Sequence, residues 1–203
     1  MIRSLLFITL LLSSPLSFAG KKSATILVVG DSLSAAYGID PQSGWVSLLA
    51  LKVAQKKQPH QVINASISGD TTINGVKRLP SLLNKYRPDI VIIELGANDG
   101  LRGLSLKAMQ NNLRQMVELC LQSDARVLLA GMKIPPNYGK RYTTVFNNTY
   151  VNLAKEYKLS LVPFLLEGVG TNSELMQADG LHPSKDAQPV ILQTVWEQLK
   201  LIL

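Results

Sequence analysis

The chain has 203 residues, of which 46% are hydrophobic and 17% charged, so it holds enough apolar material for one globular core. This composition excludes collagen, coiled-coil and intrinsically disordered proteins. The 21 Lys and Arg against 14 Asp and Glu give a net charge of +7, but no basic run exceeds two residues, so we expect no nucleic-acid partner. A single cysteine, Cys120, rules out an internal disulfide, and without a Cys/His cluster we expect no metal site.

The first 19 residues have the pattern of a secretory signal peptide. Arg3 precedes an apolar stretch at residues 5–12, and the small residues Ser17 and Ala19 follow it. The apolar stretch is shorter than the ~20 residues that span a bilayer, so it predicts cleavage after Ala19 rather than a stable membrane anchor. We therefore expect a periplasmic or secreted protein whose mature domain covers residues 20–203.

Five short apolar runs rich in β-branched residues alternate with segments of helical periodicity. The predicted strands cover residues 24–29, 61–66, 89–95, 126–130 and 159–164. The predicted helices cover residues 44–57, 72–86, 105–122, 141–157 and 185–201. This alternation predicts an α/β fold, a three-layer sandwich in which helices cover both faces of a five-stranded parallel sheet.

The third predicted helix carries an apolar stripe that faces the sheet. Its residues recur at steps of three and four, at Leu106, Met109, Leu113, Met116, Val117 and Cys120. Cys120 therefore belongs to the buried face, where apolar neighbours do not activate a thiol as a nucleophile.

Polar clusters follow the predicted strands, at the edge of the sheet where open α/β folds bind their ligands. They read GDSL at residues 30–33, SGD at 68–70, GAND at 96–99 and DGLHP at 179–183. We expect these four clusters to meet at one rim of the sheet.

Ser32, His182 and Asp179 have the residue types of a catalytic triad. A serine nucleophile needs a histidine to take its proton and a carboxylate to orient that histidine. His60 lies in a polar turn at the amino end of the second strand, so we interpret it as a solvated loop residue. His182 lies in a short loop, and Asp179 three residues earlier can reach its Nδ1 proton.

Three donors in these clusters suit an oxyanion hole, which stabilises the tetrahedral intermediate of acyl transfer. They are the backbone N–H groups of Ser32 and Gly69 and the side-chain amide of Asn98. We also expect Ser32 to stand at the amino terminus of a helix, where the helix dipole favours negative charge.

The four blocks together resemble the SGNH (GDSL-type) hydrolases: GDSL at 30–33, SISGD at 66–70, GAND at 96–99 and DGLHP at 179–183. The resemblance implies a parallel sheet of flavodoxin-like strand order. It also implies Ser32 as nucleophile, His182 as base and Asp179 as its orienting acid, with Ser32, Gly69 and Asn98 as the oxyanion hole.

This family resemblance further implies a serine hydrolase that needs no cofactor and acts on fatty acyl esters and thioesters, including lysophospholipids and aryl esters. Its expected partner is this small-molecule substrate, and we expect a monomer. Loop hydrophobes on the same rim are candidates to line an acyl groove: Leu101, Leu104, Ile134, Pro135, Pro136 and Tyr138. The acyl length and the leaving group stay open.

Three alternatives remain at this point. The same fold can serve an esterase for carbohydrate or other small acyl esters. Asp31, Asp70 and Asp99 also follow strands, and clustered carboxylates there can hold Mg²⁺ for phosphoryl transfer. A secreted binding module without catalysis is the third.

Overall fold

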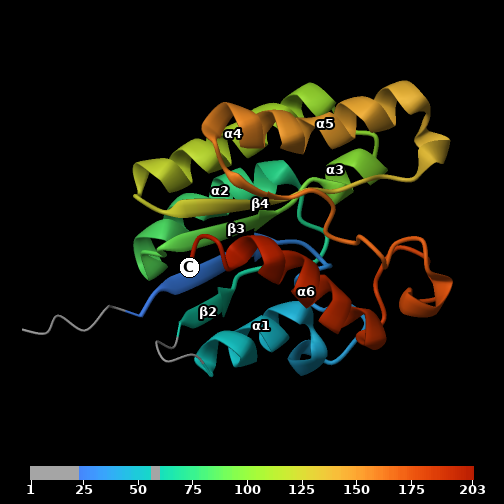
Figure 1. The fold of residues 1–203 in the computed structure, drawn as a ribbon. Helices are drawn as coiled ribbons and strands as arrows, with labels where there is room; N and C mark the ends of the chain where they lie inside the picture. Colours follow the sequence, from blue (N-terminus) through green and yellow to red (C-terminus); the bar gives the residue numbers. More distant parts are fainter. Residues whose placement is uncertain (1–22, 56–59) are drawn as a thin grey trace, which may run out of the picture.

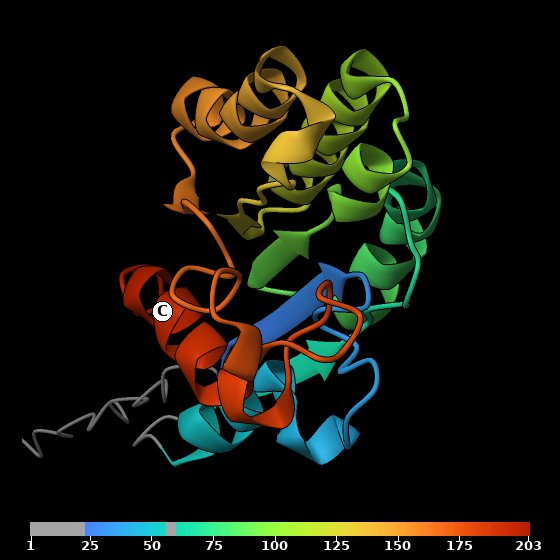
Figure 2. The ribbon, with the colours of Figure 1, turned by 90° about the vertical axis from the view of Figure 1, so that its right-hand side faces the viewer.

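The computed structural model describes residues 23–55 and 60–203 as one parallel sheet between two layers of helices (Figures 1 and 2). The predicted signal peptide at residues 1–19 and the predicted end of the first helix at 56–57 lie outside the described residues.

The sheet has five strands, all parallel, in the order β2-β1-β3-β4-β5. They are β1 (Thr25–Gly30), β2 (Gln61–Asn64), β3 (Ile90–Glu94), β4 (Arg126–Ala130) and β5 (Ser160–Val162). This is the flavodoxin-like order, in which the strand order reverses between β1 and β3. The predicted fold class is confirmed.

Strands β1 and β3 form the centre of the core. Ile26 of β1 aligns with Ile90 of β3, and Gly30 at the end of β1 aligns with Glu94 at the end of β3. All five residues of β3 are buried, which explains why its sequence, IVIIE, reads as a continuous apolar run. Glu94 is the one charged residue in that strand, and it lies directly under the polar loops.

Helices cover both faces of the sheet (Figure 1). The helices α1 (Trp45–Ala54) and α6 (Gln188–Leu199) pack together on one face. The other face carries α2 (Thr72–Tyr86), α4 (Leu106–Gln122) and α5 (Lys140–Tyr157), with the short α3 (Ala97–Leu101) beside them. The predicted helices therefore exist, with ends shifted by a few residues.

Helix α4 buries the stripe that its sequence predicts. Met109, Leu113, Met116, Val117 and Cys120 are all fully buried. Burial raises the pKa of the Cys120 thiol to about 12, so the thiol stays protonated and unreactive at neutral pH.

Several predicted elements differ in extent from those in the structure. The fifth strand ends at Val162 because Pro163 cannot donate a ladder hydrogen bond. The last helix begins at Gln188, after a 3-10 turn at Lys185–Ala187. The GAND cluster at residues 96–99 is predicted as a loop, but from Ala97 on it forms the start of helix α3. Gly96 precedes this helix with φ +118°, a backbone conformation that favours glycine.

The prediction for His60 is correct in its position but wrong in its exposure. His60 lies at the amino end of β2, as predicted, but it is half-buried rather than solvated. Its Nδ1 accepts a hydrogen bond from the Ala24 N–H at 3.1 Å, which ties the start of β2 to the residue before β1. Its role is structural and distant from the polar rim.

Within residues 23–55 and 60–203, none of the helices combines the length and the apolar character that crossing a membrane requires.

Candidate active site

Ser32 lies in a tight turn at the carboxyl end of β1. Residues 32–38 form successive turns, in which the Ala35 N–H donates to the Asp31 carbonyl and the Tyr37 N–H to the Ser32 carbonyl. The next α-helix starts at Trp45, so the prediction that Ser32 stands at a helix amino terminus is wrong. The reason is local: Gly38 and Ala36 have positive φ, which interrupts helical geometry.

Glu94, the last residue of β3, holds this turn in place by hydrogen bonds. Its Oε2 accepts the Ser34 hydroxyl at 2.6 Å and the Asp31 N–H at 3.2 Å, and Glu94 itself is fully buried. Burial, and secondarily the nearby Asp31, raise the pKa of the Glu94 carboxyl well above its usual value. A Cβ on Gly30 would come within 2.5 Å of the same Oε2, which explains why glycine opens the GDSL block.

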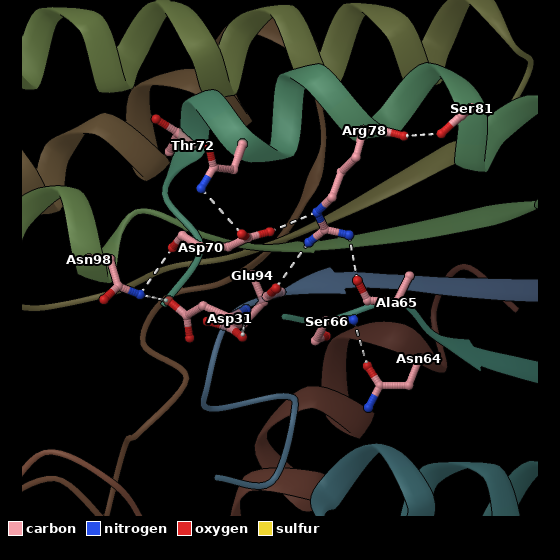
Figure 3. Close-up of polar contacts among 12 residues, drawn as sticks. Asp31, Asn64, Ala65, Ser66, Asp70, Thr72, Arg78, Ser81, Glu94 and Asn98 are labelled. Carbon is pink, nitrogen blue, oxygen red and sulfur yellow. Dashed lines mark hydrogen bonds and ion pairs between the residues drawn. The ribbon is translucent and has the colours of Figure 1, made fainter. Parts of the chain in front are cut away.

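Asp31 links the turn to Asn98 (Figure 3). One carboxylate oxygen accepts the Leu33 N–H at 3.1 Å, and the other accepts the Asn98 side-chain amide at 3.1 Å. Burial raises the pKa of Asp31 to about 6, while these hydrogen bonds act in the opposite direction. Asp31 therefore holds the Ser32 turn and the third polar cluster in one arrangement.

Arg78 of α2 joins the second cluster to the same network (Figure 3). Its Nε pairs with Asp70 at 2.7 Å, and its other nitrogens donate to the carbonyls of Ala65 and Gly30. This partly buried guanidinium thus fastens the loop after β2 to the end of β1.

The loop at 179–182 presents the histidine. Gly180 takes φ +66°, which turns the chain so that one oxygen of Asp179 accepts the N–H groups of Leu181 and His182 at 2.9 and 3.0 Å. The other oxygen lies 2.6 Å from His182 Nδ1. These bonds, the side-chain bond first, lower the pKa of Asp179 to about 2, so it is ionised at neutral pH.

The two loops meet with the geometry of a serine triad. His182 Nε2 lies 2.9 Å from Ser32 Oγ, a hydrogen-bond distance between residues 150 positions apart in the chain. Ser32 and His182 are both half-buried, so a substrate can reach them. The structure thus brings together Ser32, His182 and Asp179, the residues that the sequence singled out.

Tyr37 and Gln177 support His182, and no sequence motif marks either residue. The ring of Tyr37 lies 4.5 Å from the His182 ring, centroid to centroid. The Gln177 side-chain amide donates to the carbonyls of Tyr37 and Pro183, at 2.8 and 2.9 Å. These contacts connect the histidine loop directly to the serine turn.

The three expected oxyanion donors differ in availability. The backbone N–H groups of Ser32 and Gly69 donate to no acceptor among the described residues. The Asn98 amide, in contrast, already donates to Asp31 Oδ2 and to the Asp70 carbonyl, at 3.1 and 3.0 Å (Figure 3). Ser32 and Asn98 both line the cavity beside His182, whereas Gly69 is not among the residues that line it. The oxyanion hole of these three residues therefore stays a prediction.

A mostly apolar cavity of about 420 Å³ opens beside Ser32 and His182. Leu101, Ile134, Pro135 and Pro136 line it, as expected for an acyl groove. Further lining comes from Met132, Phe164, Leu166, Met176 and Leu181. Most of these additional residues follow β5 in the chain. All of them except Leu181 lie outside the four motifs, so the sequence does not mark them.

Tyr138 and Leu104 lie outside this cavity. The Tyr138 hydroxyl donates to the Leu101 carbonyl at 2.9 Å, and its ring lines a separate shallow hollow at the start of α5. Leu104 is 43% exposed. Tyr138 thus contacts the backbone of Leu101, which lines the cavity, but does not line the cavity itself.

The three carboxylates of the Mg²⁺ alternative point to separate partners. Asp31 binds Asn98, Asp70 pairs with Arg78, and Asp99 accepts both the N–H and the hydroxyl of Thr72. Within the described part of the chain, no three His, Cys, Asp or Glu side chains gather where they could share a metal ion. Each carboxylate thus serves a hydrogen-bond network that positions the loops.

Comparison with known proteins gives a consistent answer. The model of the GDSL-like lipase/acylhydrolase family matches residues 28–188. Esterase TesA of Pseudomonas aeruginosa is 50% identical over 179 residues, 88% of this chain and 89% of that protein. A crystal structure of TesA superposes with a TM-score of 0.86, covering 88% of this chain and 99% of the crystallised chain at 50% identity.

Two further relatives carry related names. An arylesterase of Vibrio mimicus is 48% identical over 95% of this chain and 96% of its own. Thioesterase 1/protease 1/lysophospholipase L1 of Escherichia coli is 42% identical over 91% of this chain and 88% of its own. With the family model spanning all the loops described above, the chain belongs to the GDSL-like lipase/acylhydrolase family of ester hydrolases.

Proposed function

We propose that the protein hydrolyses carboxylic esters and thioesters of fatty acids through an acyl-serine intermediate at Ser32. The contact of 2.9 Å between Ser32 Oγ and His182 Nε2, at the mouth of an apolar cavity, carries this proposal. The names of the relatives, an esterase, an arylesterase and a thioesterase/lysophospholipase, support the same substrate class.

In the first half of the reaction, Ser32 Oγ attacks the acyl carbonyl carbon while His182 Nε2 takes the hydroxyl proton. The charge that develops on the carbonyl oxygen faces the N–H groups of Ser32 and Gly69 and the amide of Asn98. His182 then passes its proton to the leaving alcohol or thiol, which departs as the acyl-serine forms.

In the second half, water attacks the acyl-serine while His182 again takes and returns a proton. Asp179 stays ionised throughout, because its low pKa keeps it a carboxylate at neutral pH. It fixes the tautomer of His182 that leaves Nε2 free to accept, and it stabilises the imidazolium.

The acyl chain would lie in the cavity lined by Ile134, Phe164 and Leu181, where apolar burial favours it by about 0.8 kcal/mol for each methylene group. The leaving group would face solvent. As part of this proposal, the protein is exported through cleavage after Ala19 and acts as a monomer.

The test is a turnover panel of p-nitrophenyl esters of increasing acyl length, acyl-CoA and lysophosphatidylcholine. We expect activity on acyl esters and thioesters, with kcat/KM rising with chain length until the cavity is filled, and no change in excess chelator. Ser32→Ala serves as the control. Activity on phosphate esters that Mg²⁺ restores after chelation, or equal activity of Ser32→Ala, would contradict the proposal.

A further inference from the structure

Two segments beside the active-site cavity form a surface that we call the basic lobe, defined as residues 101–107 and 136–145. The Tyr142 hydroxyl donates to the Gly100 and Leu104 carbonyls, at 3.2 and 3.4 Å, and so joins the two segments. Tyr138 and Tyr142 stack, with ring centroids 6.2 Å apart. In both ribbon views the start of α5 lies next to α3 (Figures 1 and 2).

The charge of the basic lobe is entirely positive. It contains Arg102, Lys107, Lys140 and Arg141 and no Asp or Glu. All four side chains belong to exposed residues, and no ion pair among the described residues involves them. Lys133, close by in the cavity wall, differs because it pairs with Glu167 at 3.6 Å.

Apolar side chains are exposed among these cations. Leu104 is 43% exposed, Val145 41% and Tyr138 38%. Tyr138 and Val145 line a shallow hollow together with Leu106 and Lys140. Cations interleaved with exposed aliphatic and tyrosine side chains suit the boundary of a lipid bilayer, where ammonium and guanidinium groups meet phosphates and amphipathic rings lie at headgroup level.

We propose that the basic lobe docks the protein on the surface of an anionic lipid bilayer. Arg102 donates hydrogen bonds to the Gly69 carbonyl and to Asn98 Oδ1, at 3.1 and 3.4 Å, but none of the four cations has a carboxylate partner among the described residues. The charge complementarity between these cations and lipid phosphates selects this occupant. The lobe borders the cavity, since Leu101 and Pro136 line the cavity and belong to the lobe. Docking therefore brings the cavity mouth close to lipid chains, although binding itself does not depend on the proposed hydrolysis.

The experiment measures sedimentation of the protein with vesicles of phosphatidylcholine containing about one third phosphatidylglycerol, against phosphatidylcholine alone. All proteins carry Ser32→Ala to prevent turnover and have the same N-terminus, so any contribution of residues 1–22 cancels between variants. We expect binding to the anionic vesicles that weakens as salt rises, because the screening length falls from about 10 Å at 0.1 M to about 3 Å at 1 M.

The double variant Lys140→Gln/Arg141→Gln should lower the partition coefficient about 10- to 30-fold, since each cation contributes roughly fivefold near an anionic surface. The matched control is Arg126→Gln/Lys155→Gln. It removes the same two residue types from exposed positions at the start of β4 and in the last turn of α5. We expect the control to bind nearly as the parent does.

Three results would overturn the docking proposal. Equal loss in both double variants would mean that net charge alone drives binding. Equal binding to phosphatidylcholine vesicles and to anionic vesicles would exclude attraction of the lobe to a negatively charged lipid surface. Absence of vesicle binding together with dimerisation that Lys140→Gln/Arg141→Gln abolishes would make the lobe an interface between two copies of the chain.

The esterase proposal is tested separately. With Ser32 intact, Lys140→Gln/Arg141→Gln should hydrolyse a water-soluble p-nitrophenyl ester at the parent rate. If this double variant loses vesicle binding but keeps ester hydrolysis, the result bears on the docking proposal and leaves the esterase proposal intact. If the parent binds vesicles but hydrolyses no ester, the esterase proposal fails and the docking proposal stands.

Discussion

The serine turn and the histidine loop each supply half of the proposed catalytic pair, Ser32 and His182, but the fold holds them in different ways. The turn rests on buried groups: Asp31 and Glu94 are fully buried and Ser34 is 1% exposed. In the loop, the side chains of His182 and Asp179 are 20% and 40% exposed. The turn that carries the half-buried Ser32 is thus anchored on buried polar groups, whereas the loop that carries His182 is held near the surface by local hydrogen bonds.

This difference separates stability from activity. Removing a partner under the serine turn leaves buried polar groups without hydrogen bonds, which costs free energy of unfolding. Removing a side chain from the histidine loop exposes its former partners to water, which costs little stability but removes a catalytic group. The substitutions below test this division, from the largest expected effect to the smallest.

His182→Ala should give the largest effect. Without a base for the Ser32 hydroxyl, we expect kcat on a p-nitrophenyl ester to fall by about 10⁴-fold or more, with the melting temperature nearly unchanged. Steady-state kinetics and thermal unfolding measure the two quantities. A fall in stability comparable to that of a core substitution would show that the loop is not independent of the core.

Asn98→Ala tests the donor that the structure shows already engaged. We expect kcat to fall about 10²–10³-fold, as for loss of one oxyanion donor, with KM changed little. Because Asn98 also binds the buried Asp31, the variant should lose some stability, which His182→Ala should not. An unchanged kcat would mean that the backbone donors of Ser32 and Gly69 suffice.

Glu94→Ala should act mainly on stability. It leaves the Asp31 N–H and the Ser34 hydroxyl without their acceptor in a fully buried place, at a cost of about 3 kcal/mol in the free energy of unfolding. Glu94→Gln keeps an acceptor oxygen and the neutral form, so it should cost about 1 kcal/mol. Urea unfolding of Glu94→Ala and Glu94→Gln measures the two costs. Equal costs would argue against the role of Glu94 as a buried hydrogen-bond acceptor.

Asp31→Asn should change how stability depends on pH. Because burial raises the pKa of Asp31 to about 6, the folded protein keeps a proton between pH 4 and 6 that the unfolded chain releases. The raised pKa of Asp31 therefore lowers the free energy of unfolding by about 3 kcal/mol as the pH rises through this window. The variant should lose this part of the fall, whereas Glu94, whose pKa is also raised by burial, keeps its own contribution.

Asp179 should make stability depend on pH in the opposite direction. Its pKa is lowered to about 2, so its contribution is present above pH 4 and is lost as the pH falls toward 2. The two windows do not overlap, and unfolding measured at pH 3, 5 and 7 separates them. An equal fall in stability from pH 4 to 6 in the parent and in Asp31→Asn would contradict the assignment to Asp31.

The sequence predicts much of the fold because its signals are local. Apolar runs such as residues 89–95 and the stripe of α4 are visible in the chain, and the parallel sheet requires the loops to gather at one edge. The triad residues were identifiable because two histidines left few choices and each cluster followed a strand. The length of β5 and the start of α6 depended on tertiary context.

The parts that the sequence did not predict depend on long-range contacts. Gln177 donates to the Tyr37 carbonyl across 140 residues of chain, the Tyr37 ring contacts the His182 ring, and neither residue belongs to a motif. Glu94 had a signal that could have been used: an acid that ends a strand of four apolar residues must find buried partners. Helix α3 was missed because glycines in GANDG favour a loop by propensity.

The central claim is that Ser32 is a nucleophile activated by His182, and covalent labelling tests it most directly. A fluorophosphonate probe should add one phosphonyl group per chain, and mass spectrometry of the digested protein should locate it on Ser32. His182→Ala should label far more slowly. A probe found on another residue, or labelling of Ser32→Ala at the parent rate, would contradict the account.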